Sequence, residues 1–257
     1  MKTSGSKLFL LLPYLVYLVQ AALYQPNDTN SKPVKNIGVV LFPSFDVVDV
    51  FGSLEPLNLL SLQRQLNLYM IAATLDPIST APRAMSAFNS SFGEVIMPSH
   101  TFDSVVRDPT LDLDMLLVPG GIGTRAPDLN DTIQFVADVF PRLQYLVAPC
   151  TGAGIAARAG VLDGRRATTN KRSWNATVAL GPKTYWVARA RWVRDGHVFT
   201  GSGVTAAIDT MFAWIGHVWG EATAADLALG IEYERHTDPS WDPFGEHYGL
   251  SDVPPLR

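Results

Sequence analysis

Residues 147–154 read Val-Ala-Pro-Cys-Thr-Gly-Ala-Gly, and they join a short apolar run to a stretch of small residues. The run 145–148 predicts a buried strand, and residues 151–159 predict a helix. Cys150 therefore stands at a strand-to-helix turn. Ligands of open α/β sheets bind at the carboxyl ends of the strands, so a side chain on this turn faces a binding site. The helix N-terminus favours a thiolate, which predicts a lowered pKa for Cys150.

Cys150 is the only cysteine among the 257 residues. A disulfide within the chain is therefore excluded, and so is a cysteine-based metal site, so we expect no metal. A lone cysteine is more often a buried structural residue than a reactive one. Its position at the strand-to-helix turn nevertheless favours a nucleophile.

Strands and helices are expected to alternate along the chain. Buried strands are expected at 36–42, 68–73, 114–119 and 145–148, and helices at 47–62, 130–141, 151–159, 205–218 and 222–232. The turn signal Asp195-Gly196 predicts a hairpin between 187–193 and 197–200. A further small hairpin or crossover is expected within 88–97. This alternation predicts an α/β fold with a mostly parallel sheet covered on both faces.

Three acidic residues follow the first expected strand: Asp46, Asp49 and Glu55. That strand ends on the same rim of a parallel sheet as Cys150, so a carboxyl there could exchange a proton with the thiol. Asp46 precedes a helix and fits the role of an N-cap. Asp49 and Glu55 lie further inside, among apolar residues, and a cap explains them poorly. Both remain candidates for the proton-transfer group.

A glycine-rich turn, 120–123, follows the strand expected at 114–119. Glycines allow the backbone to approach a ligand closely, so the N–H groups of Gly120 and Gly121 are candidate oxyanion donors. An ordinary turn explains these glycines equally well.

The N-terminus resembles a secretory signal peptide. Lys2 and Lys7 precede the apolar run 8–19, and small residues follow it, so we expect a signal at 1–21 and a linker at 22–35. A membrane anchor is the alternative, which Pro13 and the shortness of the run disfavour. Four of the nine asparagines begin Asn-X-Ser/Thr sequons, namely Asn27, Asn89, Asn130 and Asn175. Together these features predict an N-glycosylated protein of the secretory pathway, without stable membrane insertion after cleavage, or a cytoplasmic protein if the run is no signal.

The formal net charge is −4, and the sequence contains no basic stripe. We therefore do not expect nucleic acid as a partner. The expected partner is a small-molecule substrate. We expect one domain over 36–235, with the Pro- and Asp-rich tail 236–257 packing on it.

Four blocks together resemble the ThiJ/PfpI family, and they occur in the family's order. They are 42–55, with Phe-Pro-Ser…Asp…Gly-Ser-Leu-Glu; 114–123, with Asp-Met-Leu-Leu-Val-Pro-Gly-Gly; 148–171, around Cys-Thr-Gly; and 200–209. The resemblance covers residues 36–235. It implies a flavodoxin-like three-layer sandwich of the class I glutamine amidotransferase type, with a nucleophile elbow and a homodimeric assembly.

Within this family the motifs are most similar to those of isonitrile hydratases. The resemblance implies a cofactor-free lyase that hydrates an isonitrile to an N-formamide. Cys150 would form a thioimidate, Asp49 would transfer protons, and Thr151 with the backbone of Gly120 and Gly121 would orient the intermediate. Asn170 stands where many relatives have histidine, which argues against a Cys-His triad. A glyoxalase- or deglycase-like hydratase and a non-catalytic, redox-sensing or binding relative are the alternatives.

Overall fold

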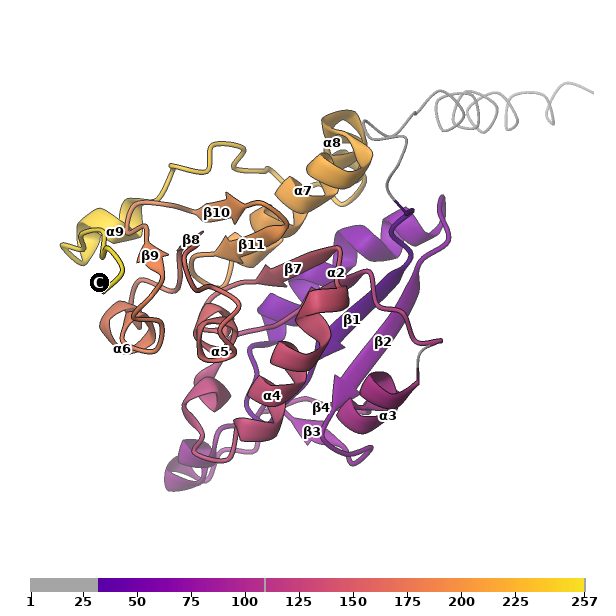
Figure 1. Ribbon diagram of the computed structural model, residues 1–257, viewed down its shortest axis with the longest axis horizontal. Coiled ribbons are helices and arrows are strands. Elements are labelled where there is room, and N and C mark those ends of the chain that lie inside the picture. Colours follow the sequence, from indigo (N-terminus) through magenta and orange to yellow (C-terminus); the bar gives the residue numbers. More distant parts are fainter. Residues whose placement is uncertain (1–31, 109, 257) are drawn as a thin grey trace, which may run out of the picture.

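The computed structural model describes residues 32–108 and 110–256, and a seven-stranded sheet forms its centre (Figure 1). In sheet order the strands are β10 (Trp192–Asp195), β11 (Val198–Gly201), β7 (Tyr145–Ala148), β6 (Met115–Leu117), β1 (Asn36–Val40), β2 (Asn67–Ala72) and β5 (His100–Thr101). All neighbouring strands are parallel except β10 and β11, which form an antiparallel pair. The mostly parallel sheet is thus confirmed.

Helices cover both faces of the sheet. On one face, α2 (Val47–Ser61), α7 (Ala206–Trp219) and α8 (Glu221–Gly230) pack on one another. On the other face lie α3 (Phe102–Arg107), α4 (Asn130–Val139) and α5 (Gly152–Arg158), as Figure 1 shows. Met115, Leu116 and Leu117 of β6 are completely buried because a central strand meets a helix layer on either side. The flavodoxin-like three-layer sandwich is confirmed.

Shorter elements fill the connections. A small antiparallel pair joins β3 (Ile78–Ser79) to β4 (Val95–Ile96), and a small parallel pair joins β8 (Arg166–Ala167) to β9 (Tyr185–Trp186). The remaining elements are α6 (Trp174–Val178) and the 3₁₀ turns η1 (Arg83–Phe88), η2 (Ile122–Arg125) and η3 (Phe140–Arg142). The partner of β4 therefore lies upstream of the region 88–97 in which a hairpin was expected. Helix α2 includes Pro56 in its interior.

The prediction of a strand at 187–193 is wrong for the first five of these residues. The observed strand begins at Trp192, and most of the backbone hydrogen bonds before it go to loops and side chains. The carbonyl of Val187 accepts from the Thr168 hydroxyl, and the N–H of Arg191 donates to the carbonyl of Pro239. The N–H of Val187 does bond to a strand, donating to the carbonyl of Ala167 at the end of β8 at 2.8 Å. Loops and side chains satisfy the two groups named above, so the segment stays irregular.

The C-terminal tail packs on the domain. It contains a short helix, α9 (Pro243–His247), and a β-bridge between Val253 and Trp186. Gly245 is buried, and a Cβ there would stand 2.8 Å from the carbonyl oxygen of Ala188. The tail thus runs back across the segment 186–191.

The expected signal peptide 1–21, most of the linker 22–35, and Asn27 lie outside the described residues. The other three sequon asparagines, Asn89, Asn130 and Asn175, are exposed, as glycan attachment requires. Within residues 32–108 and 110–256, no helix is both long and apolar enough to span a bilayer. The compartment and the glycans stay predictions, as does the homodimer.

Candidate active site

Cys150 occupies a strained turn between β7 and α5. Its φ is 52°, a left-handed conformation that costs a residue other than glycine about 1 kcal/mol. Tertiary contacts hold both of its backbone groups: its N–H donates to the carbonyl of Gly201 at 3.1 Å, and its carbonyl accepts from the Thr169 hydroxyl at 2.8 Å. Strain maintained in this way is typical of functional sites, and it fits the expected nucleophile elbow.

Glycines allow the neighbouring chain segments to approach this turn. A Cβ on Gly120 would stand 2.6 Å from the Thr151 nitrogen and 2.8 Å from the Cys150 Cβ. A Cβ on Gly152 would stand 2.0 Å from the carbonyl oxygen of Val118. Because real Cβ atoms are not found so close to backbone atoms, the turn that follows β6 can touch the elbow only through glycine.

Asp49 reaches the elbow from the first turn of α2. Its side chain is completely buried, and its Oδ2 accepts a hydrogen bond of 2.7 Å from the N–H of Gly120. Its Oδ1 is buried without a hydrogen-bond partner among the described residues. Burial raises the pKa of the Asp49 carboxyl well above its ordinary value, and the nearby Asp46 carboxylate adds to the rise. Contact with the Gly120 N–H and the Cys150 thiol opposes the rise only in part.

The expectation of a low pKa for Cys150 is wrong in this structure. The side chain is 4% exposed, and burial raises the pKa of the thiol. The charge of Asp49 raises it further, while donors from Thr151 and Asn170 oppose the rise. Desolvation outweighs the short helix α5 because a buried thiolate loses its hydration and faces a carboxylate. The thiol and the Asp49 carboxyl therefore form a couple that retains a proton.

Asn170 contacts the sulfur directly. Its Nδ2 donates to the Cys150 Sγ at 3.5 Å, and its Oδ1 accepts from the N–H of Ser173 at 3.0 Å. Sequence reasoning considered this position only as a missing histidine. The signal that could have found it was its place in the motif block around Cys150, 20 residues after the cysteine.

Thr151, Gly120 and Gly121 lie at the elbow as expected, but the N–H groups of the two glycines already donate to side chains. The N–H of Gly120 is occupied by Asp49, and the N–H of Gly121 donates to the Thr151 hydroxyl at 3.0 Å. That hydroxyl in turn donates to the carbonyl of Gly121 at 3.2 Å. These bonds tie the glycine turn to the elbow. The donors that face the sulfur are instead the Thr151 backbone N–H and the Asn170 amide.

Two further acidic residues lie away from the thiol chemistry. Glu55 is exposed on α2, where its Oε2 accepts from Asn58 at 3.3 Å, so the structure does not bring it to the site. Helical periodicity explains this, because six residues separate Glu55 from Asp49 and turn it to another face. Asp46 caps α2 by accepting from the N–H groups of Val48 and Asp49, as predicted.

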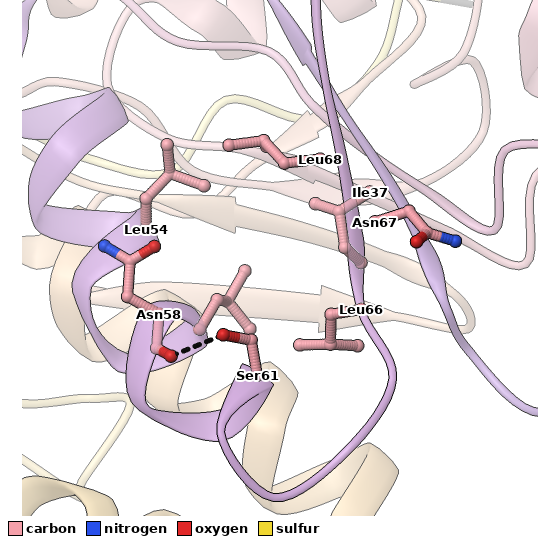
Figure 2. A pocket seen from close by; sticks show the side chains of 8 residues that line it. Ile37, Leu54, Asn58, Ser61, Leu66, Asn67 and Leu68 are labelled. Atoms are coloured by element: carbon pink, nitrogen blue, oxygen red, sulfur yellow. Dashed lines mark hydrogen bonds between the residues drawn. The ribbon is translucent and has the colours of Figure 1, made fainter.

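No group of three or more histidine, cysteine or acidic side chains within residues 32–108 and 110–256 has the arrangement of a metal site. The structure also contains a cavity of about 110 Å³ away from the thiol (Figure 2). Its lining includes Ile37 and Leu68, near the starts of β1 and β2, and Leu54 of α2. Parallel strands that begin here end at the opposite edge, where Cys150 lies, so this cavity is not the site of the thiol.

The fold and this site define an α/β domain with a strained strand-to-helix elbow, in which a buried thiol faces a buried carboxyl. The profile of the DJ-1/PfpI family matches residues 35–216, and the chain belongs to that family.

Individual relatives differ in what they do. The isonitrile hydratase of Pseudomonas putida is 31% identical over 199 residues, which cover 77% of this chain and 78% of that protein. The HTH-type transcriptional regulator GbdR of Pseudomonas aeruginosa is 27% identical over 78% of this chain, which spans 51% of the regulator. A crystal structure of a ThiJ/PfpI family protein from Pseudomonas syringae superposes with a TM-score of 0.64 at 29% identity, over 84% of this chain and 81% of that one. Drosophila melanogaster DJ-1beta, at 16% identity, 78% and 99% coverage, and a TM-score of 0.58, shares the fold.

Proposed function

We propose that this chain is a hydratase that adds water to an isonitrile and releases an N-formamide. The observation that carries the proposal is the buried Asp49 carboxyl, with one oxygen unpartnered, beside a thiol whose pKa is raised. Such a pair can both deliver and accept a proton, as the hydration of an isonitrile requires. The similarity to the Pseudomonas putida isonitrile hydratase supports the same chemistry.

In the first step, the sulfur of Cys150 attacks the terminal carbon of the isonitrile. A carbon–sulfur bond forms, the thiol proton passes to Asp49, and Asp49 delivers it to the same carbon. The product is a thioimidate, Cys–S–CH=N–R. The raised pKa of Asp49 makes its carboxyl a competent acid in this step.

In the second step, Asp49 accepts a proton from water, whose oxygen adds to the thioimidate carbon, and delivers that proton to the nitrogen. The carbon–sulfur bond of the resulting tetrahedral adduct then breaks, while the hydroxyl proton of the adduct passes through Asp49 to the leaving sulfur. The adduct becomes the N-formamide. The Thr151 N–H and the Asn170 amide stabilise the negative charge on the departing sulfur.

Acyl transfer with a Cys-His base fits the site less well. The amide of Asn170 occupies the position beside the sulfur and cannot take a proton as an imidazole does. A redox sensor also fits poorly, because a buried thiol of raised pKa carries little of the thiolate that peroxide oxidises.

The test is turnover of an aryl or alkyl isonitrile by the purified protein, with the formamide followed by NMR. Wild type and Glu55→Gln are expected to turn over equally, because Glu55 is exposed away from the thiol, and Cys150→Ala is expected to be inactive. Undiminished turnover by Cys150→Ala, or none by wild type, would contradict the proposal. Consumption of methylglyoxal without any isonitrile turnover would favour an aldehyde hydratase instead.

A further inference from the structure

The C-terminal strap, which we define as residues 236–253, bonds to the rest of the domain at two buried ion pairs, one of which includes a strap residue. Asp209 of α7 binds Arg191 at 2.6 Å and accepts from the N–H of His236, where the strap begins. Asp242 of the strap binds Lys171 at 3.0 Å. The side chains of Lys171 and Asp242 are 2% and 1% exposed, so neither charge meets solvent.

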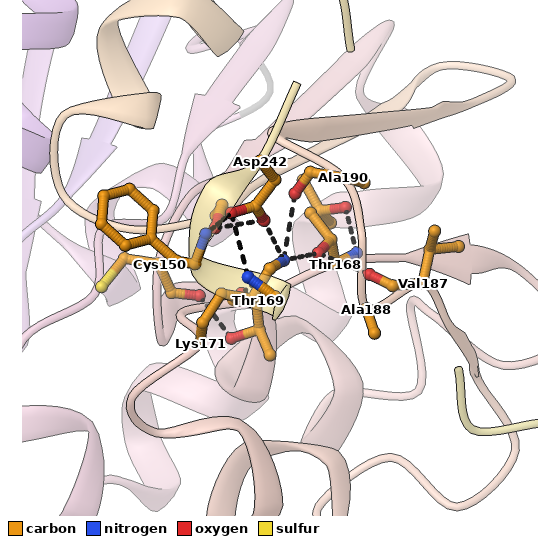
Figure 3. Close-up of polar contacts among 12 residues, drawn as sticks. Cys150, Thr168, Thr169, Lys171, Val187, Ala188, Ala190 and Asp242 are labelled. Carbon is orange, nitrogen blue, oxygen red and sulfur yellow. Dashed lines mark hydrogen bonds and ion pairs between the residues drawn. The ribbon is translucent and has the colours of Figure 1, made fainter. Parts of the chain in front are cut away.

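Lys171 joins three segments that are far apart in the sequence (Figure 3). Its Nζ donates to the Thr168 hydroxyl and to the carbonyl of Ala190, at 2.5 and 3.0 Å. It also donates to the carbonyl of Thr169 at 3.3 Å. With the bond to Asp242, the ammonium group connects the loop 168–173, the segment 187–191 and the strap.

The loop 168–173 makes two of the contacts that define the site. Its Thr169 hydroxyl holds the carbonyl of the strained Cys150, and its Asn170 amide donates to the sulfur. The ammonium group of Lys171 is therefore bonded within the same short loop that places a donor on the thiol.

Asp242 is fixed as tightly as its partner. Its Oδ1 accepts from the N–H groups of Phe244 and Gly245, at 2.9 and 3.3 Å, and so caps α9, while its Oδ2 binds Lys171. A buried ion pair adds little net stability, because desolvating both charges offsets their attraction, but it does fix geometry. This pair fixes the position of the loop relative to the strap.

We infer that Lys171 and Asp242 are positioning residues, through which the C-terminal strap holds Asn170 against the Cys150 sulfur. The inference rests on the proposed function for its effect on turnover, although the effect on the thiol itself can be measured independently. Without the ion pair, the loop no longer holds the amide on the sulfur. The thiolate then loses a donor, and its formation becomes less favourable.

The experiment measures alkylation of Cys150 by iodoacetamide across a range of pH, which is unambiguous because the chain has no other cysteine. Asp242→Asn and Asn170→Ala are each expected to lower the alkylation rate at a given pH about fivefold, the effect of losing one hydrogen bond. The double variant Asn170→Ala/Asp242→Asn is expected to react no more slowly than Asn170→Ala alone, because both changes act through the same contact.

Asp209→Asn is the matched control, since it disrupts the other buried ion pair, to which the first residue of the strap bonds, and does not change a partner of Lys171. It is expected to lower stability without changing the alkylation profile. The inference would be overturned if Asp209→Asn slowed alkylation of Cys150 as much as Asp242→Asn does, or if slowing in the double variant were additive. It would also be overturned if Asp242→Asn left the alkylation profile unchanged, or if it made alkylation faster by opening the site. Isonitrile turnover is measured in parallel. We expect kcat to fall in Asp242→Asn while KM stays near that of wild type. Absence of turnover in wild type would sink the proposed reaction but leave the alkylation result interpretable.

Discussion

The side-chain amide of Asn170 donates a hydrogen bond to the sulfur of Cys150 across 3.5 Å. A neutral amide stabilises negative charge on sulfur but cannot accept the thiol proton. Among the groups of the described chain that shift the pKa of this thiol, Asp49 is the carboxyl whose own pKa is raised by burial. We therefore propose that Asp49 transfers the proton at this elbow, while Asn170 is a hydrogen-bond donor.

Asp49→Asn is expected to lower kcat for isonitrile hydration at least about a hundredfold, because it removes the acid and base while keeping an acceptor for the Gly120 N–H. Steady-state kinetics measure this effect. A kcat within threefold of wild type would show that another group carries the proton.

The same substitution is expected to change how stability depends on pH. The pKa of Asp49 is raised above 3.8, so as pH rises through this region the unfolded chain releases its proton before the folded one. The stability contributed by the protonated group is present below pH 3.8 and is lost as pH rises through the folded pKa. The Asp49→Asn variant has no such titrating group. Its free energy of unfolding, measured in urea, should therefore decline less between pH 4 and pH 8 than that of wild type. Equal declines in the two proteins would argue against a raised pKa.

Gly120→Ala is expected to abolish activity and to lower the free energy of unfolding by about 2 kcal/mol. Its Cβ would lie 2.6 Å from the Thr151 nitrogen, so the elbow must shift. Gly203→Ala is the control near the same site, because its Cβ would meet Asn170 Nδ2 at an ordinary 3.7 Å. Thermal unfolding and turnover separate the two variants, and equal behaviour would contradict the crowding argument.

Cys150→Gly is expected to be inactive yet more stable than Cys150→Ala by about 1 kcal/mol. The left-handed φ of 52° is strained for alanine and free for glycine, while the backbone bonds to Gly201 and Thr169 are retained in both. Chemical denaturation of the two variants measures the difference. An alanine variant as stable as the glycine variant would indicate an unstrained elbow.

Lys171→Met is expected to remove a rise in stability at alkaline pH. Burial lowers the pKa of Lys171 from 10.5 to about 8, although Asp242 and the charge of Asp252 oppose the shift. Between these values the unfolded chain binds more protons than the folded one, so the free energy of unfolding increases with pH. Lysines with an ordinary pKa contribute equally in both proteins. The free energy of unfolding, measured in urea, should therefore rise less between pH 7.5 and pH 10 in the variant than in wild type. An identical rise in the two proteins would contradict the lowered pKa of Lys171.

Much of this architecture was predictable because it depends on local patterns. The apolar run at 145–148 predicted β7 at its observed bounds, and the Asp195-Gly196 turn predicted the hairpin of β10 and β11. The strand at 187–193 was overpredicted, because Thr168, Lys171 and Pro239 take its backbone groups and none of them is close in sequence.

The sequence by itself determined most of the strands and helices, the strand-to-helix turn and the position of Cys150 on that turn. These features depend on periodicity and glycine content, which act within a few residues. Only the tertiary structure decided that Asp49 and not Glu55 enters the site, that the Gly120 and Gly121 amides are already bonded, and that Asn170 faces the sulfur. It also decided the direction of the Cys150 pKa shift, because desolvation is a property of the assembled core. The hydrogen bond from the Gly120 N–H to Asp49 joins residues that are 71 positions apart in the sequence. The ion pair of Lys171 and Asp242 joins the loop 168–173 to the C-terminal strap. Contacts of this kind form only when folding brings distant segments together.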